Sequence, residues 1–408
     1  MKILHTSDWH LGKKLEDISR FDEQKSVVNE IIQIADNQNP ELIIIAGDIY
    51  DTANPSNDAQ ELFYRSVKKL SNNGKRIIII IAGNHDSPDG INAPEPIARM
   101  NGIFMIGDLS KVIEPFELDS GIKLINSDMG FLEFRFDEYN YPLRIITTPY
   151  INELRLKKLL SAKHGEKDVL ALLEKKWQEL SKRYCDKNGV NILTAHLYMA
   201  GKGESDEIEP MDERSILHIG GLRKLFTDSV PEVIQYTALG HLHRFNILKS
   251  GSGYPVIYSG SILEYSFSEA MQDKYVIVSE IFPDSMPDIK KIELKSGKKL
   301  KRARFKNIDA ATDWLKNNHD SYVELTIVTD KFIDMEIQKR LHGIHDKIVS
   351  IIPEVVLNNN EKDNSDNFSL NEDFETLFQK FFKYKKDNLA PSEDIMELLK
   401  EIRNMKSD

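Results

Sequence analysis

Two metal-ligand side chains lie one residue apart near the beginning of the sequence. Asp8 and His10 follow residues 2–6, whose apolar and β-branched side chains predict a short strand. A strand that ends in Asp-x-His offers a carboxylate and an imidazole to one cation. This spacing occurs once in the 408 residues. Because two residues do not complete a metal site, its other ligands must come from elsewhere in the chain.

Four other predicted strands also end in ligand-type residues. They are followed by Asp48 (strand 42–46), Asn84 and His85 (77–82), His196 (191–195), and His241 and His243 (234–239). Each alone has an ordinary explanation as a turn, a helix cap or a surface histidine. His-x-His is more specific, because alternate residues of an extended chain point the same way. Five such strand ends together favour one site at the carboxyl edge of an α/β structure.

The residue types narrow the metal chemistry. Imidazole, carboxylate and amide ligands favour manganese, iron or zinc over calcium, and the single cysteine, Cys185, excludes a thiolate cluster. A two-metal phosphoryl-transfer site needs a group that bridges both ions. Asp48 is the bridging candidate, since a carboxylate has two oxygens. The six remaining histidines lack a comparable setting and are interpreted as structural: His5, His164, His218, His319, His342 and His345.

The order of apolar and amphipathic segments predicts an α/β domain over residues 1–283. Helical patterns at 22–37, 57–73 and 166–187 alternate with doubly buried strands. Between 234 and 282 the strands follow one another more closely, which predicts a second, more antiparallel sheet.

Three further segments follow a Pro-rich break at 282–287. Residues 284–357 have the pattern of a small α+β domain, and residues 358–373 are polar enough for a flexible linker. Residues 374–408 contain two amphipathic helical patterns. Their apolar faces are formed by Phe374, Leu377, Phe378 and Phe381 in the first and by Ile395, Leu398, Leu399 and Ile402 in the second.

The charge distribution limits the choice of partners. A net charge of −11 argues against a general binder of polyanions, although nine Lys or Arg and one acid lie between Lys290 and Lys306. That basic run fits a solvated hairpin or a nucleic-acid contact equally well. The sequence shows no secretory signal, and its longest apolar run is too short to span a bilayer. We therefore expect a cytoplasmic protein without a membrane contact.

The motifs occur in the order typical of one enzyme superfamily. Asp8-x-His10, Gly47-Asp48, Gly83-Asn84-His85-Asp86, His196 and Gly240-His241-x-His243 resemble the signature of the calcineurin-like metallophosphoesterases. Within that superfamily, the stretch from Ile3 to Gly12 with its Trp9 is most similar to the SbcD family of nucleases, and the resemblance covers nearly the whole chain. It implies a four-layer αββα sandwich, a capping domain over 284–357 that contacts DNA, and C-terminal helices that bind the ATPase SbcC.

The resemblance also implies residue roles and partners. One manganese would be held by Asp8, His10, Asp48 and His243, and the other by Asp48, Asn84, His196 and His241; magnesium, iron or zinc remain alternatives. His85 would contact the scissile phosphate without binding metal. The implied activity is that of a double-strand exonuclease and single-strand or hairpin endonuclease in DNA repair and recombination. The chain would form a homodimer within a heterotetramer, in which only the partner uses ATP.

Two other interpretations stay open. The same ligands would serve a metallophosphoesterase that hydrolyses a small phosphoester or a nucleotide. A scaffold that kept the fold and lost its metals is less consistent with the complete set of ligand residues and with the presence of His85.

Overall fold

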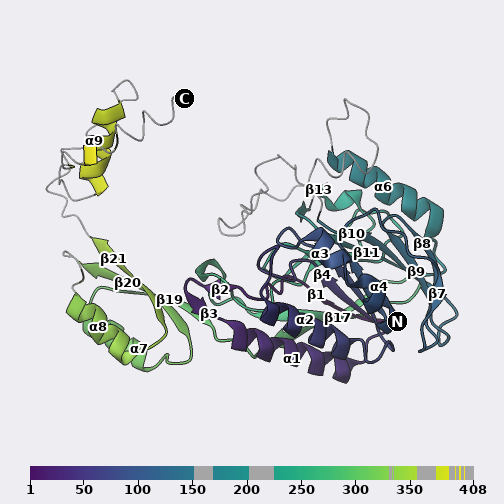
Figure 1. Ribbon diagram of the computed structural model, residues 1–408, viewed down its shortest axis with the longest axis horizontal. Helices are drawn as coiled ribbons and strands as arrows, with labels where there is room; N and C mark the ends of the chain where they lie inside the picture. The colour runs from purple at the N-terminus through teal and green to yellow at the C-terminus, as the bar shows by residue number, and fades with distance from the viewer. Residues whose placement is uncertain are drawn as a thin grey trace. The chain divides into compact units, whose positions relative to one another are not determined.

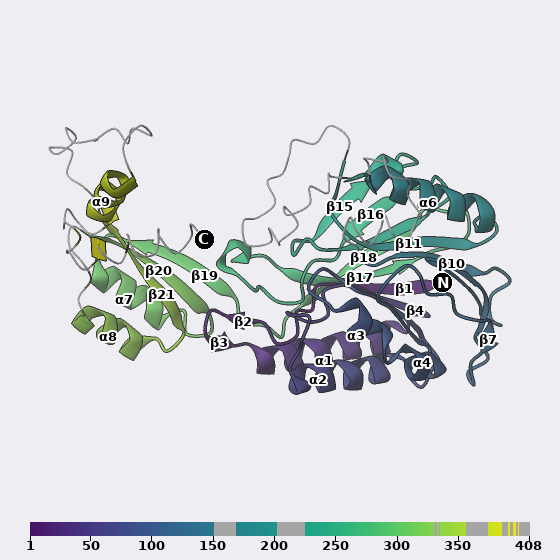
Figure 2. The same ribbon diagram turned by 45° about the horizontal axis from the view of Figure 1, so that its top comes forward.

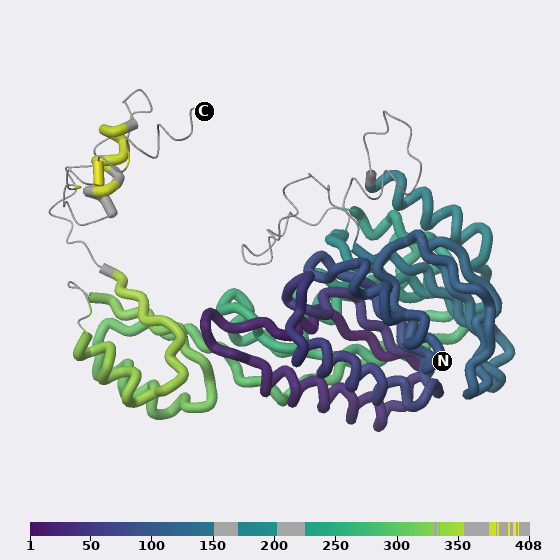
Figure 3. The backbone as a smooth tube through the Cα atoms, in the orientation of Figure 1, coloured from purple at the N-terminus to yellow at the C-terminus, as the bar shows by residue number. Residues whose placement is uncertain are grey.

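The computed structural model describes residues 1–150, 169–201, 225–329, 333, 335–355, 374–385, 391, 395, 396 and 399; the others are drawn in grey in Figure 3. The chain divides into two units, Met1–Glu354 and Val355–Asp408. The first unit contains the two large sheets and every candidate site residue.

One large sheet has six strands in the order β18-β17-β1-β4-β5-β6. Their bounds are β1 Lys2–Thr6, β4 Leu42–Ala46, β5 Ile77–Ile81, β6 Ile103–Ile106, β17 Lys274–Glu280 and β18 Asp288–Leu294. The strands β1, β4, β5 and β6 are parallel neighbours, whereas β17 runs antiparallel to β1. The predicted apolar strands β4 and β5 are buried along their whole length, as central strands covered on both faces must be.

The other large sheet has eight strands in the order β15-β16-β14-β11-β10-β9-β8-β7. Their bounds are β7 Phe116–Glu117, β8 Lys123–Asp128, β9 Phe131–Arg135, β10 Leu143–Thr148, β11 Val190–His196, β14 Tyr236–Gly240, β15 Asn246–Lys249 and β16 Pro255–Tyr258. The prediction that residues 234–282 form a separate, more antiparallel sheet is wrong. The strands β14 and β16 extend this sheet in parallel with β11, and β17 crosses to the six-stranded sheet. Such pairings over long sequence distances leave no local pattern.

The two sheets pack face to face, with helices on the outside (Figure 1, Figure 2). The helices of this unit's sandwich are α1 Phe21–Gln38, α2 Asn57–Leu70, α3 Pro88–Asn92, α4 Glu95–Ala98 and α6 Val169–Tyr184. Side chains of β1 alternate between two cores, because Leu4 packs toward α1 and α2 while Ile3 packs against the second sheet. Trp177 of α6 belongs to a third core on the outer face of the second sheet. These layers confirm the αββα sandwich.

The helices agree closely with their predicted ranges. The second one ends at Leu70 and not at 73, because Asn72 and Asn73 adopt left-handed backbone conformations with φ of 46° and 58°. The predicted residues 166–168 of the third helix lie outside the described ranges. Short elements complete the sandwich: β2 Lys14–Leu15, β3 Ile18–Ser19, β12 Met199–Ala200, β13 Leu225–Phe226, and the 3₁₀ helices η1 Arg99–Asn101, η3 Thr227–Ser229 and η4 Phe267–Glu269.

The chain leaves the six-stranded sheet only after β18. This strand pairs with β17 from Asp288 opposite Glu280 to Leu294 opposite Lys274. The boundary expected between 283 and 284 separates these two paired strands, so we place the boundary after β18. Beyond it lie β19 Leu300–Phe305, α7 Ile308–Lys316, β20 Tyr322–Thr329, α8 Met335–Ile344 and β21 Ile348–Val355. The three strands form their own sheet beside a small apolar core, and we call residues 300–354 the cap domain.

Both apolar and polar contacts attach the cap domain to the sandwich. Leu300 and Tyr322 pack with Phe267 in a separate apolar cluster. The Tyr322 hydroxyl donates to Glu23 Oε1 at 3.0 Å, and the buried Arg20 donates to the same carboxylate from Nε and Nη2. The cap domain is thus joined to α1 and to the loop that contains η4.

The second unit contains α9, Phe374–Lys385, at the position of the first predicted C-terminal helix. The expected linker 358–373 and most of the second predicted helix lie outside the described residues. Within the described parts of the chain, no helix has the length and apolar character needed to cross a membrane.

Candidate metal centre

The candidate ligands leave the carboxyl ends of β1, β4, β5, β11 and β14. Backbone hydrogen bonds join the first two loops, since Asp8 N donates to Gly47 O and His10 N donates to Asp48 O, both at 3.0 Å. Asp8, His10, Asp48 and His241 have positive φ angles of 52°, 44°, 48° and 106°. Such angles are uncommon for residues other than glycine and persist where the surroundings fix them. The backbone conformations of these loops therefore bring the candidate ligand side chains together.

Three glycines let these loops approach one another. A Cβ atom on Gly47 would lie 2.2 Å from His196 Nδ1, and one on Gly83 would lie 2.1 Å from Asp48 Oδ1. A Cβ atom on Gly240 would lie 1.9 Å from Ala46 O. Each glycine immediately precedes a candidate ligand, so the absence of a side chain is what permits the ligands to converge.

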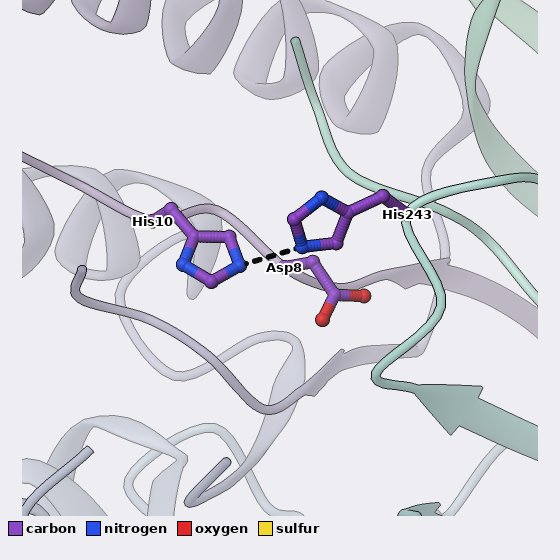
Figure 4. A group of neighbouring side chains, drawn as sticks. All are labelled: Asp8, His10 and His243. Atoms are coloured by element: carbon purple, nitrogen blue, oxygen red, sulfur yellow. Dashed lines mark hydrogen bonds between the residues drawn. The ribbon is translucent and has the colours of Figure 1, made fainter. Parts of the chain in front are cut away.

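Asp8, His10 and His243 form the first cluster (Figure 4). One ligand atom from each lies within 4.8 Å of the others, and all three residues are buried. The two imidazole rings meet with His10 Nε2 2.9 Å from His243 Nε2. This geometry brings together residues separated by more than two hundred positions in the sequence.

Asp48 connects this group to a second one formed with Asp8 and His196. The Asp48 Oδ2 atom lies 3.6 Å from His10 Nε2 and 3.4 Å from His196 Nε2, so one carboxylate oxygen faces both groups. Asn84 Oδ1 lies 2.9 Å from His196 Nε2 and 3.2 Å from His241 Nδ1. All seven predicted ligands therefore belong to one continuous cluster.

Burial and neighbouring charges separate the pKa values in this cluster. Burial alone would raise the pKa of Asp48, but His196, His10 and His85 lower it well below its ordinary value. Burial lowers the pKa of His10 well below its ordinary value. Burial also acts to lower the pKa of His196, but Asp48 outweighs it and raises that pKa to about 9. The lowered pKa values of Asp48 and His10 favour the forms in which these residues bind a cation, and a cation at His196 would compete with a proton.

His85, like Asn84 beside it, is only half buried, whereas the other candidate ligands are buried. Its backbone N–H donates to Asp48 Oδ1 at 2.9 Å. Its Nδ1 lies 2.7 Å from the carbonyl oxygen of Asp51, which can only accept, so Nδ1 carries the proton. This hydrogen bond leaves Nε2 as the ring nitrogen that can meet a substrate.

The cluster fits divalent cations on its own chemistry. Two buried carboxylates and several imidazoles converge without a thiolate, which is a donor set suited to manganese, iron or zinc. His10 Nδ1 is buried and has no hydrogen-bond partner among the described residues. Two imidazole nitrogens only 2.9 Å apart, with Asp48 Oδ2 3.6 Å from one of them, indicate ligand atoms and not an ordinary polar core.

Sequence reasoning missed the residues that support the ligands. The buried carboxylate of Asp86 accepts from the backbone N–H groups of Ile49, Tyr50 and Gly83 and so ties two ligand loops together. Ser7 Oγ contacts Asp8 Oδ2 and lies 2.8 Å from Ser259 Oγ. Asp86 was visible within its motif, but a serine in a distant loop carries no signal of its role.

The structural interpretation of the other histidines holds for His5 and His345, which are buried and hydrogen-bonded. His5 Nε2 lies 3.1 Å from Leu239 O, and its Nδ1 lies 3.1 Å from the Tyr236 hydroxyl, so His5 joins the two sheets. His345 Nε2 lies 3.0 Å from Asn318 O within the cap domain. His164 and His218 lie outside the described residues.

Comparison with known proteins agrees with this geometry. Residues 1–245 match the model of the calcineurin-like phosphoesterase family, and the chain belongs to that family. More particularly, it is similar to the SbcD component of the nuclease SbcCD of Bacillus subtilis (strain 168), with 32% identity over 98% of this chain and 97% of the relative. The corresponding SbcD protein from Staphylococcus epidermidis is 30% identical over 95% of this chain and 94% of the relative.

A dimetal phosphatase from Danio rerio covers 72% of this chain and 99% of its own, with a TM-score of 0.39 and 11% identity. That similarity is too distant to add to the assignment. The family and the two sequence relatives identify the protein as a metal-dependent hydrolase of phosphodiesters, with the fold and the nuclease character of the SbcD family.

Proposed function

We propose that the protein is a manganese-dependent DNA nuclease that uses two metal ions. It would act as a double-strand exonuclease and as a single-strand or hairpin endonuclease in DNA repair and recombination. The observation that carries the proposal is the convergence of seven ligand-type residues, six of them buried, in one cluster within a chain that matches SbcD nucleases over nearly its whole length.

The residues divide into two metal shells that share Asp48. Asp8, His10 and His243 would complete one shell, and Asn84, His196 and His241 the other. The position of Asp48 Oδ2 between His10 Nε2 and His196 Nε2 supports the bridging role. Bound ions would neutralise charge on the phosphoryl oxygens and activate the attacking water.

The protein groups hold these ligands in fixed orientations. Ala46 O accepts from His196 Nδ1 at 2.9 Å, which directs His196 Nε2 into the cluster. His241 N donates to Asp8 Oδ1 at 3.0 Å, so two ligands position one another. His85 would meet the scissile phosphate through Nε2 and stabilise or protonate the leaving oxygen.

The basic run at 290–306 gives little support for a DNA contact by this chain alone. Carboxylates pair three of its nine basic side chains: Arg302 Nε lies 2.6 Å from Glu324 Oε1, Arg304 Nη2 lies 2.7 Å from Glu354 Oε1, and Lys299 Nζ lies 2.9 Å from Asp273 Oδ1. We propose that the DNA contact depends largely on an ATPase partner of the SbcC type. In that complex the partner alone would use ATP.

The C-terminal segment is the proposed docking element for that partner. The helix α9 carries Leu377, Phe378 and Phe382 without burying any of them fully. An amphipathic helix with aromatic anchors suits a helix-in-groove or coiled-coil contact. A homodimer is proposed as well, and the highly exposed Ile97 and Met100, at 76% and 70% exposure, are candidates for that interface.

A small phosphoester or nucleotide is the alternative substrate, because the same ligands would serve it. The two are distinguished by testing end-labelled duplex and single-stranded DNA with Mn²⁺, with and without SbcC, against a small phosphodiester. The nuclease proposal expects DNA cleavage that EDTA abolishes. Turnover of the small ester without any cleavage of DNA, even with SbcC present, would favour the alternative.

The bridging role of Asp48 is tested in the same assay. Asp48→Ala should lose manganese and nuclease activity together, because both shells lose a ligand. Manganese content, measured by elemental analysis, should fall from two ions per chain in the wild type. A variant that keeps two ions would show that Asp48 does not bridge.

A further inference from the structure

A buried carboxylate lies directly behind His243. Glu269, the last residue of η4, is 2% exposed, and its Oε1 lies 3.0 Å from His243 Nδ1. The same oxygen accepts from Tyr265 N at 3.2 Å, while Oε2 accepts from Ser261 Oγ at 3.0 Å and from Lys274 Nζ. Four donors thus surround one carboxylate and use its full acceptor capacity.

These contacts determine which ring nitrogen of His243 carries the proton. A carboxylate that pairs with the Lys274 ammonium and accepts from every other neighbour can only accept, so His243 Nδ1–H is the donor. Nε2 then keeps its lone pair. That atom lies 2.9 Å from His10 Nε2, inside the metal cluster. The contact of Glu269 with Nδ1 therefore leaves Nε2 as the nitrogen of His243 that can bind metal.

The backbone of His243 is held by the same group of residues. Its carbonyl oxygen accepts from Ser261 N at 3.1 Å and from Lys274 Nζ at 3.0 Å. Lys274 is 5% exposed and so contacts both the backbone of His243 and the carboxylate that orients its ring. Residues of the segment 261–274 therefore hold both the backbone and the ring of His243.

We propose that Glu269 is a positioning residue of the metal centre, which sets the tautomer and the ring orientation of His243 and is itself held by Lys274. The inference rests on the proposed function, because it requires His243 to be a metal ligand. Residues that orient ligating histidines in this way typically contribute about 10- to 100-fold to metal affinity.

The direct test is titration of metal-free protein with Mn²⁺ by calorimetry. Glu269→Gln should weaken manganese binding about 10- to 100-fold. The matched control is Glu95→Gln, since Glu95 is also a fully buried carboxylate paired with a lysine, Lys111 Nζ at 2.6 Å, and should bind manganese as the wild type does. A folded Glu269→Gln protein with wild-type affinity would overturn the proposal.

A second measurement needs neither metal nor activity. Nitrogen NMR of histidine-labelled, metal-free protein should show His243 protonated at Nδ1, and Glu269→Gln should shift the ring toward a mixture of tautomers. A wild-type ring protonated at Nε2 would also overturn the proposal. If Glu269→Gln fails to fold, Glu269→Asp keeps the charge beside Lys274 while shortening its reach to Nδ1, and it carries the same expectation.

These measurements distinguish a failure of the proposed function from a failure of the proposed role of Glu269. A wild-type protein that binds no manganese contradicts the proposed function, whereas the tautomer of His243 still reports on Glu269. Normal manganese binding by the wild type together with unchanged binding by Glu269→Gln contradicts the positioning role alone.

Discussion

His85 is proposed to act on substrate, although its imidazole also lies within 4.8 Å of ligand atoms of His10 and Asp51. Its Nδ1 is committed to Asp51 O and its backbone to Asp48, so its position is fixed without a metal. His85→Ala should keep two manganese ions and lose about 10²- to 10⁴-fold in DNA cleavage rate, the usual contribution of a general acid. Single-turnover kinetics with elemental analysis would measure both.

The control for this variant is His342→Ala, an exposed histidine of α8, which should cleave at the wild-type rate. Full activity in His85→Ala would remove its catalytic role, and loss of manganese would instead make it a ligand.

His5 is expected to make the sandwich sensitive to acid. Burial lowers the pKa of His5 to about 3, so it stays neutral in the folded protein while the unfolded chain takes up a proton below about pH 6.5. Its contribution to stability is therefore complete above pH 6.5 and is lost as the pH falls toward 3. Between pH 7.5 and pH 5 the loss should be about 2 kcal/mol.

Urea unfolding of the metal-free wild type and of His5→Gln at both pH values tests this. Glutamine can donate to Leu239 O and accept from Tyr236 without titrating, so the variant should lose about 2 kcal/mol less on acidification. Equal losses in the two proteins would show that His5 is not responsible.

At the scale of single residues, the sequence predicted those site residues whose side-chain type is itself suited to binding metal. Asp8 and His243 could be recognised because five predicted strands end in ligand-type residues and these two belong to the specific spacings Asp-x-His and His-x-His. Glu269 and Ser259 could not, because glutamate and serine are ordinary loop residues and only the folded contacts with His243 and Ser7 give them a role.

At the scale of elements, the site depends on how closely strand ends can pack. β14 ends at Gly240, where a Cβ atom would lie 1.9 Å from Ala46 O at the end of β4. Gly240→Ala should destabilise the protein by about 1–3 kcal/mol, as overpacking does, and should weaken manganese binding because His241 and His196 are displaced. Thermal unfolding and calorimetric titration would measure the two effects.

Gly343→Ala provides the comparison, since a Cβ atom there meets nothing within 4 Å. It lies in the helix α8, where alanine is favoured by up to about 1 kcal/mol, so stability should stay constant or rise. A Gly240→Ala protein as stable as the wild type would show that the strand ends can separate.

Helices and strands were predicted well where a short stretch of sequence carries the whole pattern. Runs such as five consecutive isoleucines in β5 define a buried strand by their own composition. The pairing of β17 with β1 and of β18 with β17 joins residues 2–6 to residues 274–294, and no short-range pattern contains that information. The assignment of residues 234–282 to a separate sheet was wrong for this reason.

At the scale of the whole molecule, the hydrolytic unit and the C-terminal unit are separate bodies. Deleting residues 374–408 should therefore abolish SbcC binding while leaving hydrolysis of a simple phosphodiester within about twofold of the wild type. Co-purification and a chromogenic phosphodiester assay would test both. An unchanged complex would refute the docking proposal.

Point substitutions in α9 refine this prediction. Phe378→Glu should act like the deletion because it places a charge on the aromatic face, whereas Gln379→Ala, at an exposed position of the same helix, should bind normally. Normal SbcC binding by Phe378→Glu would place the contact elsewhere in the segment.

The 3₁₀ helix η4 has only three residues, yet its two ends belong to different parts of the molecule. Phe267 packs with Leu300 and Tyr322 of the cap domain, and Glu269 contacts His243. A displacement of Phe267 by the cap domain would therefore act two residues away from the carboxylate that contacts His243. If DNA binds more tightly when metal is present, bound DNA must raise the affinity for metal by the same factor, because the coupling free energy between two binding sites is reciprocal.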